Sequence, residues 1–210
     1  MTDKELSWKY AEEFPVEPPA TQLARQHSLE LGIDPVSPAV GAQLAVLAAA
    51  SGARSILEIG TGAGVSGLWL LQGAPKATLT SIDVEIDHQN RARQAYLDAG
   101  IAASRARLIA GRAVDVLPRM NDSAYDLVLV DADPGSVLDY VEHALRIVRP
   151  GGIVAVAHAL WRGRVADPAQ RDDTVADFRA LLATIAESSA VVAALSTLGD
   201  GLLQIVKTAD

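Results

Sequence analysis

The sequence of 210 residues is half hydrophobic, which is enough for one domain with a sizeable core and too short for two domains of ordinary size. Its formal net charge of −8 argues against nucleic acid as a partner, because affinity for the phosphate backbone rests on clustered lysine and arginine. The absence of cysteine excludes a disulfide scaffold, a cysteine nucleophile and a thiolate metal site, and it suits a reducing compartment.

The N-terminal part of the chain is polar and charged. Residues 1–13 contain no apolar stretch of signal-peptide length, and no apolar segment reaches the roughly 18 residues that a bilayer span requires. We therefore expect a cytoplasmic protein that makes no use of a membrane. The proline-rich segment from Phe14 to Ala20 is expected to be extended. Residues 1–35 are assigned to the substrate or dimer side of a single domain that spans residues 1–210.

Beyond residue 35, short apolar runs alternate with helical patterns, which predicts a doubly wound α/β fold with a mostly parallel sheet and helices on both faces. A first helix is expected to begin at Pro38, with Ser37 as its cap, and to end at Gly52. The expected strands are Ser55–Ile59, Leu79–Asp83, Ala106–Ala110, Leu127–Asp131, Ile153–Ala157, Ala190–Leu195 and Leu202–Val206. The helices between them are expected around residues 65–71, 87–99, 137–148 and 175–185.

The end of the chain departs from simple alternation. Gly199-Asp200-Gly201 separates the last two strands and is typical of a hairpin, so one closing strand is expected to be antiparallel to the others. A polar stretch, Trp161–Asp173, precedes the last helix. Five alternating units followed by a hairpin are not what two symmetric dinucleotide-binding halves would give.

The turn after the first expected strand is rich in glycine and leads into a helix, whose free N–H groups suit an anion. Gly62, Gly64 and Gly67 satisfy the dinucleotide pattern G-x-G-x-x-G. Gly60, Gly62 and Gly64, preceded by Glu58, satisfy E-x-G-x-G-x-G, which is similar to the methyltransferase version. A carboxylate at the mouth of this loop favours an ammonium group over a pyrophosphate, so Glu58 favours the second interpretation.

Ligands of open α/β sheets bind beyond the carboxyl ends of the strands, so the residues that follow the other strands are candidates too. Asp83 suits ribose hydroxyl groups in either interpretation. Asp131 and Asp133 are carboxylates near the expected reaction centre, where such pairs bind a metal or position a reacting group. His158 directly follows the fifth strand, whereas His27, His88 and His143 are expected at the surface.

These residues resemble a known group, the cation-dependent class I O-methyltransferases, which include catechol and caffeoyl-CoA O-methyltransferases. The resemblance extends from about Val36 to Leu202. Its markers are the segments 56–64 and 125–133, Leu138-Asp139-Tyr140, Arg149-Pro150-Gly151-Gly152, the segment 160–165 and Gly199-Asp200-Gly201-Leu202.

The resemblance implies a seven-stranded sheet with its last strand reversed, S-adenosylmethionine as cofactor, a small-molecule hydroxyl as methyl acceptor and a homodimer. It also implies contacts with the cofactor. Glu58 and Ser66 would hold the methionine end near Val36 and the Gly60-Thr61 backbone, and Asp83 would hold the ribose. Ala113 would lie by the adenine. The full implied set is Val36, Glu58, Gly60, Thr61, Gly62, Gly64, Ser66, Asp83, Val84, Ala113, Asp131 and Asp133.

The departures from the family concern its metal. The family holds a divalent cation with the aspartate after the fourth strand and an Asp-Asn pair after the fifth. Asp131 matches the first of these ligands, but the pair falls on Ala157 and His158, and a family lysine falls on Pro134. A divalent metal is therefore doubtful, because Mg²⁺ prefers near-octahedral oxygen coordination.

Two mechanisms remain open, with His158 and Asp131 as the catalytic candidates. The preferred one is metal-independent transfer with His158 as general base. In the other, Asp131, His158 and Asp133 form a mixed site for Zn²⁺, Mn²⁺ or Fe²⁺. Two alternatives to the reaction also remain, a catalytically silent cofactor-binding protein and an NAD-dependent oxidoreductase. The acceptor is expected under the 161–173 stretch, where Arg162, Arg164 and Arg171 would favour an anionic or phenolic molecule.

Overall fold

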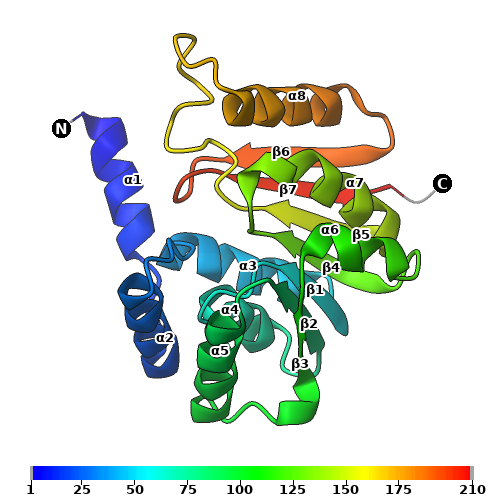
Figure 1. The fold of residues 1–210 in the computed structure, drawn as a ribbon. Helices are drawn as coiled ribbons and strands as arrows, with labels where there is room; N and C mark the ends of the chain where they lie inside the picture. The colour runs from blue at the N-terminus through cyan, green and yellow to red at the C-terminus, as the bar shows by residue number, and fades with distance from the viewer. Residues whose placement is uncertain (1, 209–210) are drawn as a thin grey trace.

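A seven-stranded sheet forms the centre of the computed structural model, which describes residues 2–208 (Figure 1). The strand order is β3-β2-β1-β4-β5-β7-β6. The strands are β1 (Ser55–Ile59), β2 (Thr78–Asp83), β3 (Ala106–Ala110), β4 (Tyr125–Val130), β5 (Val148–Val156), β6 (Val191–Ser196) and β7 (Leu202–Lys207). The predicted doubly wound architecture and all seven predicted strands are confirmed.

The strands β1 to β5 run parallel, and the closing hairpin supplies the reversed strand. β7 pairs antiparallel with β5, from Ile153 opposite Val206 to Val156 opposite Leu203. β6 pairs antiparallel with β7, so β6 again runs in the common direction. The fifth strand is longer than predicted, since it begins at Val148, which pairs with Tyr125 before the register shifts.

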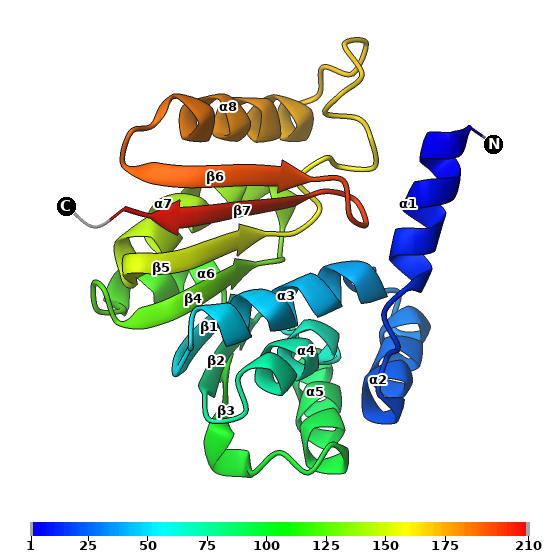
Figure 2. The same ribbon diagram turned by 180° about the vertical axis from the view of Figure 1, so that it is seen from behind.

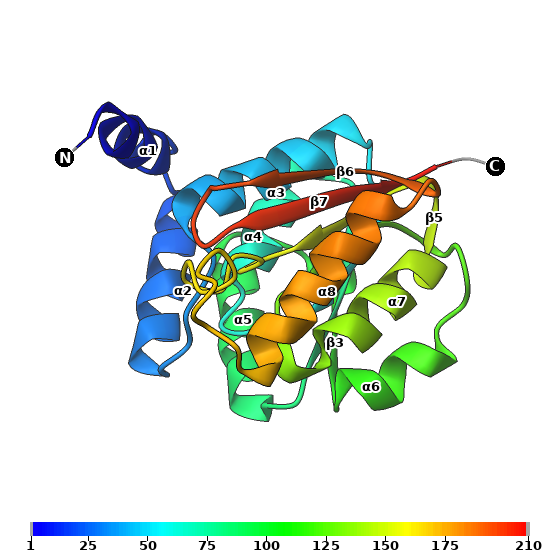
Figure 3. The same ribbon diagram turned by 90° about the horizontal axis from the view of Figure 1, so that it is seen from above.

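Helices cover both faces of the sheet. The first face carries α3 (Pro38–Ala50), α4 (Val65–Gly73) and α5 (Ile86–Asp98), and the second carries α6 (Ala113–Val116), α7 (Val137–Ile147) and α8 (Asp173–Glu187) (Figures 1 and 3). Short 3₁₀ turns lie at Ala103–Arg105, Leu117–Arg119 and Pro134–Ser136. Successive strand residues point to opposite faces, so Ile56 packs in the first core and Leu57 in the second.

Two glycines allow α3 and α4 to pack closely. A Cβ atom on Gly41 would lie 2.3 Å from the ring of Trp69, and one on Gly73 would lie 2.0 Å from the carbonyl oxygen of Ala45. The start of α3 is as predicted, because the Ser37 hydroxyl accepts the Val40 N–H at 3.3 Å and Pro38 occupies the first turn.

The N-terminal segment contains two helices that the sequence analysis did not predict. They are α1 (Asp3–Glu13) and α2 (Pro19–Glu30), so α2 takes the last two residues of the segment expected to be extended. α1 buries none of its residues and projects from the edge of the molecule (Figures 2 and 3). Its C-terminal end is held by Glu12, whose carboxylate accepts the Ser37 hydroxyl at 2.7 Å and the Gly199 N–H. Within residues 2–208, no helix has the length and apolar character of a membrane span.

Candidate active site

The glycine loop between β1 and α4, residues 60–64, is built from left-handed glycines. Gly60, Gly62 and Gly64 have φ angles of 96°, 50° and 94°, which side-chain-bearing residues rarely adopt. At Gly60 the space is also closed, because an added Cβ atom would lie 1.8 Å from the carbonyl oxygen of Asp131. The loop from β1 therefore packs its backbone directly against the end of β4.

Asp83 holds this loop in place from the end of β2. Its Oδ2 atom accepts the backbone N–H groups of Thr61 and Gly62, both at 2.9 Å, and its Oδ1 atom accepts the N–H of Glu85 at 2.9 Å. The same Oδ1 atom lies 3.8 Å from Nδ1 of His88. Charged acceptors make strong hydrogen bonds with backbone N–H groups, so Asp83 stabilises this conformation of the loop.

Glu58 lies beneath the glycine loop rather than at its mouth, where the sequence analysis placed it. It is 0 % exposed, and its two carboxylate oxygens accept the hydroxyl groups of Ser66 and Ser81, each at 2.6 Å. Burial raises the pKa of Glu58 from 4.5 to about 8, while the two hydroxyl groups oppose this rise. The Ser81 hydroxyl also bonds to that of Thr61 at 2.7 Å, so Glu58 is joined to the loop through side chains.

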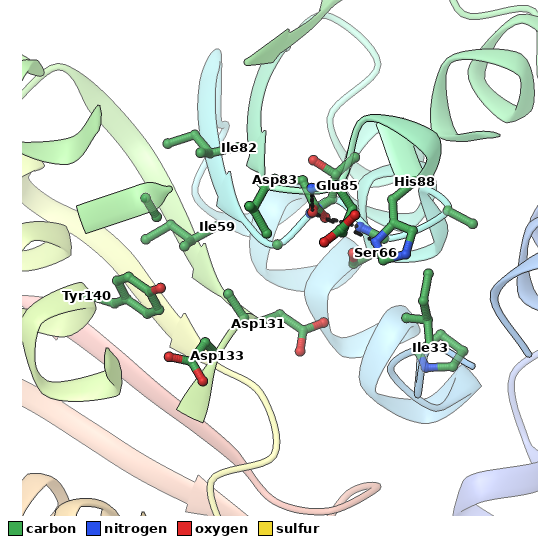
Figure 4. Close-up of a pocket in the computed structure, with 18 of the residues that line it drawn as sticks. Ile33, Ile59, Ser66, Ile82, Asp83, Glu85, His88, Asp131, Asp133 and Tyr140 are labelled. Atoms are coloured by element: carbon green, nitrogen blue, oxygen red, sulfur yellow. Dashed lines mark hydrogen bonds and ion pairs between the residues drawn. The ribbon is translucent and has the colours of Figure 1, made fainter. Parts of the chain in front are cut away.

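A cavity of about 420 Å³ opens above the loop, at the carboxyl ends of the strands. Figure 4 shows Asp131 and Asp133 from the end of β4, with Asp83, Glu85 and His88 across from them. The predicted cofactor residues that line it are Val36, Gly60, Thr61, Gly62, Ser66, Asp83, Val84, Ala113, Asp131 and Asp133. Of the predicted set, Glu58 and Gly64 do not line it. The volume is in the range of pockets that bind small molecules and cofactors.

The cavity is also lined by side chains that the sequence analysis did not select, among them those of His88, Arg112 and Tyr140. His88 was expected at the surface, but the first turns of α5 bring it beside Asp83. Arg112 lies just before α6, and Tyr140 reaches the cavity from α7. Burial raises the pKa of Tyr140, and a hydrogen bond with Ser136 opposes this rise. No local signal in the sequence places His88 there, because its position depends on how α5 packs over the end of β2.

A second, smaller cavity of about 30 Å³ adjoins the first. Asp131, Ala132 and Asp133 line both cavities, whereas Trp161 and Phe178 line only the smaller one. The rings of Trp161 and Phe178 are stacked with their centroids 5.8 Å apart. Asp131 thus stands between the large cavity and the small one.

His158 lines the smaller cavity and faces Asp131. Its Nε2 atom lies 3.5 Å from Oδ1 of Asp131, and its Nδ1 atom lies 3.6 Å from Oδ2 of Asp200. Burial raises the pKa of Asp131, and the neighbouring His158 opposes this rise. The structure therefore brings together the two predicted catalytic residues, and it adds Asp200, which the sequence analysis treated only as part of a turn.

The donor set at this point does not fit the Mg²⁺ ion of the resembled family. Among residues 2–208, no group of three or more histidine, cysteine or acidic side chains is placed to hold a metal. Asp131 contributes carboxylate oxygens, but the neighbouring positions carry the methyl group of Ala157 and the imidazole of His158. Mg²⁺ prefers about six oxygen ligands, which these side chains do not supply.

Two of the three arginines of the 161–173 stretch form ion pairs with aspartates. The guanidinium of Arg162 pairs with Asp34 at 2.7 Å, and that of Arg164 pairs with Asp172 at 2.8 Å. Arg171 is exposed, and none of the three lines either cavity. The prediction that they favour an anionic acceptor gains no support from their positions.

The chain is similar to known proteins over nearly its whole length. A model of the O-methyltransferase family matches residues 21–208. A putative O-methyltransferase of Mycobacterium marinum is 47% identical over 204 residues, which are 97% of this chain and 91% of the relative. A crystal structure of a protein from Corynebacterium glutamicum superposes with a TM-score of 0.90 at 30% identity, covering 100% of this chain and 99% of the other.

A further solved structure is that of the O-methyltransferase TomG from Streptomyces achromogenes, which is involved in tomaymycin synthesis and was crystallised with S-adenosylmethionine. It has a TM-score of 0.83 and is 31% identical, and the match covers 100% of each chain.

Proposed function

Because the chain belongs to the O-methyltransferase family, we propose that it transfers a methyl group from S-adenosylmethionine to a hydroxyl group of a small molecule, without a divalent metal. The observation that carries this proposal is the position of Asp131, which lines both the large cavity and the small one. Asp131 would then border the methyl donor in the large cavity and the methyl acceptor in the small one.

The large cavity suits a nucleoside with a cationic amino-acid end. Asp83 and Glu85 lie at the end of β2, where ribose hydroxyl groups would be bound, and Ala113 lies beside the position proposed for the adenine. Ser66 lies at the start of α4 with Glu58 directly behind it. We propose that Glu58 acts on the methionine end through Ser66, since its own carboxylate does not reach the cavity. The acidic lining suits the positive charge of the cofactor.

When bound, the cofactor would supply an electrophilic methyl group on a sulfonium, from which a neutral thioether is a good leaving group. The protein then has to align an acceptor oxygen and remove its proton. His158 is the proposed base, because its ring lines the small cavity and its Nε2 atom faces Asp131. The stacked rings of Trp161 and Phe178 give that cavity an apolar wall. No step of this proposal uses a metal, because the side chains present do not fit one.

The direct test of this proposal is calorimetry with S-adenosylhomocysteine, with and without a chelator. We expect binding that the chelator leaves unchanged. Preferential binding of NADH would contradict the proposed cofactor, and a loss of binding on chelation would contradict metal independence. Replacing Asp83 with alanine should remove the hydrogen bonds to Thr61 and Gly62 and weaken binding about tenfold or more, since hydrogen bonds to charged groups contribute about 1.5–3 kcal/mol.

The base is tested by His158→Ala once a methylated product is found. We expect kcat to fall by about 10²–10⁴-fold, the usual contribution of general base catalysis. An unchanged rate would remove His158 from the mechanism. Tight cofactor binding with no product from a broad panel of hydroxyl compounds would instead favour a catalytically silent cofactor-binding protein, which the altered positions 157 and 158 also allow.

A homodimer and a cytoplasmic location complete the proposal. Large apolar side chains are exposed on and after α1, among them Trp8, Tyr10 and Phe14, which is 76% exposed. A second copy of the chain is an occupant that would cover such residues. Light scattering tests the dimer, and a monomeric mass at micromolar concentration would contradict it.

A further inference from the structure

The turn between β6 and β7 carries Asp200 to the catalytic end of the sheet. Beyond the last β5–β7 pair, the Ala159 N–H donates to the Gly201 carbonyl at 3.0 Å and the Leu160 N–H donates to the Asp200 carbonyl at 2.9 Å. Gly201 has a φ of 88°, and a Cβ atom there would lie within 2.7 Å of the Leu160 backbone nitrogen. The turn is therefore fixed against the segment that follows His158.

The carboxylate of Asp200 makes two contacts with this segment. Its Oδ1 atom accepts the backbone N–H of Arg162, and its Oδ2 atom lies 3.6 Å from Nδ1 of His158. His158, Trp161 and Arg162 all have positive φ angles, of 56°, 46° and 55°. Such conformations are costly for residues with side chains and persist where the surroundings enforce them. Asp200 is one of the groups that enforce them here.

The two nitrogens of the His158 ring face different carboxylates. Nδ1 faces Asp200, and Nε2 faces Asp131 at 3.5 Å, on the side of the small cavity. In a neutral imidazole one nitrogen keeps the proton, and the partner of the other nitrogen decides which one it is. Each carboxylate favours a proton on the nitrogen beside it, so Asp131 and Asp200 compete for the ring proton. Burial raises the pKa of Asp131 and so disfavours its charged form, which leaves Asp200 as the carboxylate that holds the proton on Nδ1, with the lone pair on Nε2.

We propose that Asp200 is a positioning residue: it orients the ring of His158 and keeps the proton on Nδ1, so that Nε2 is presented to the methyl acceptor. This inference rests on the proposed function, in which His158 is the base. The proton taken by Nε2 is the acceptor's hydroxyl proton, and the oxygen's electron pair forms the new bond to carbon while the C–S bond breaks. The side chain of Asp200 does not line the cofactor cavity, and it transfers no proton in this proposal.

The test uses Asp200→Asn, because an asparagine keeps the shape of the side chain. Its carbonyl oxygen can still accept the Arg162 N–H, whereas its amide group would donate to Nδ1 and force the proton onto Nε2. The position of the proton is measured on the full-length protein with S-adenosylhomocysteine by ¹H–¹⁵N NMR of the histidine rings, at a pH where the ring is neutral. His158→Gln identifies the signal, since the chain has only 4 histidines.

We expect the wild-type protein to carry the proton on Nδ1 and Asp200→Asn to carry it on Nε2, with unchanged affinity for S-adenosylhomocysteine. With an acceptor in hand, kcat should fall about 10²-fold or more in Asp200→Asn while KM changes little. The matched control is Asp167→Asn, the same substitution on the exposed loop, whose carboxylate accepts the Ala169 N–H at 2.9 Å. It should leave the proton and the rate as in the wild type.

Two outcomes would overturn the inference: a wild-type ring with its proton on Nε2, or an Asp200→Asn protein whose ring signals match those of the wild type. The NMR result does not require turnover, so it is separable from the proposed function. A wild-type protein that does not bind S-adenosylhomocysteine contradicts the proposed function, and the ligand-free spectra then decide the role of Asp200.

Discussion

The glycine loop, residues 60–64, and the segment after β5, residues 157–163, lie at the same edge of the sheet and are built in opposite ways. In the glycine loop, the left-handed positions are all glycines, and Asp83 satisfies its backbone N–H groups. In the segment after β5, the left-handed positions include His158, Trp161 and Arg162, held by contacts with Asp200. The first is relaxed and matches the family pattern throughout, and the second is strained and departs from that pattern at positions 157 and 158.

The difference separates a loop that suits the methyl donor from a segment to which we assign a proposed role in activating the acceptor. A relaxed, preformed loop suits a ligand that is common to many enzymes, here the methyl donor. A strained segment with an imidazole in place of oxygen ligands suits a change in how the acceptor is activated. The two regions meet at Asp131, whose carbonyl oxygen contacts the loop and whose carboxylate faces His158.

The largest expected effect is that of Gly60→Ala, which tests how rigid the loop is. An added Cβ atom would overlap the Asp131 carbonyl oxygen, so we expect a loss of more than about 3 kcal/mol in the free energy of unfolding and loss of S-adenosylhomocysteine binding. The control is Gly62→Ala, where the nearest atom lies at 3.5 Å, with an expected cost of about 1–2 kcal/mol. Denaturant unfolding measures both, and equal costs would show that the loop is free to shift.

A smaller effect, dependent on pH, is expected from Glu58. Its pKa is raised to about 8 in the folded protein, so the folded state holds a proton that the unfolded state releases above pH 4.5. The free energy of unfolding should therefore fall as the pH rises between 4.5 and about 8, by up to ~1.4 kcal/mol per pH unit from this group.

The control for this prediction is Glu58→Gln, which resembles the protonated carboxyl and cannot titrate. Its stability relative to the wild type should rise steadily over the same pH range in urea unfolding. Parallel pH profiles for the two proteins would mean that Glu58 is already ionised in the folded state, and the proposed link through Ser66 would then involve a buried charge.

In the segment after β5, two substitutions of Trp161 test for strain, with an expected effect of about 1 kcal/mol on the free energy of unfolding. Glycine normally costs ~0.5–1 kcal/mol relative to alanine, but Trp161 has a φ of 46°, which favours glycine. Trp161→Gly should therefore be at least as stable as Trp161→Ala, and both should bind S-adenosylhomocysteine like the wild type. A clear advantage for alanine in thermal unfolding would argue against strain in this segment.

The smallest effect is expected from Arg162→Gln. The ion pair of Arg162 with Asp34 is mostly exposed, and such pairs contribute about 0–1 kcal/mol. The contact that we consider important comes from the backbone N–H of Arg162 and survives the substitution. A loss well above 1 kcal/mol in the free energy of unfolding, or a change in the His158 ring signals, would show that the guanidinium of Arg162 helps to hold this segment.

The sequence predicted most of the sheet and the cofactor side of the site, because those features depend on local patterns. Alternating apolar runs identify strands, and glycines with Asp83 at a strand end identify the loop. Glu58 was recognised but placed wrongly, since a strand residue and its neighbours do not reveal how deeply a loop covers it. Only the packing of Ser66 and Ser81 around it shows that it is buried.

The remaining features depend on contacts between distant parts of the chain. α1 buries none of its residues, so its sequence lacks the apolar stripe by which helices are recognised. Asp200 reads as a turn residue until β7 is placed beside β5. His88 likewise reads as a surface residue until α5 is placed over the end of β2. No local pattern carries that information.

The contact between Glu12 and Gly199 joins residues that are 187 positions apart in the sequence. Because Gly199 directly precedes Asp200, the first helix and the histidine proposed as the base share a common support. An enzyme trimmed or tagged at its beginning would therefore be altered at the reaction centre while its cofactor cavity stayed intact. Preparations of this protein that bind the methyl donor yet turn over poorly should be compared first by the integrity of their N-terminal helix.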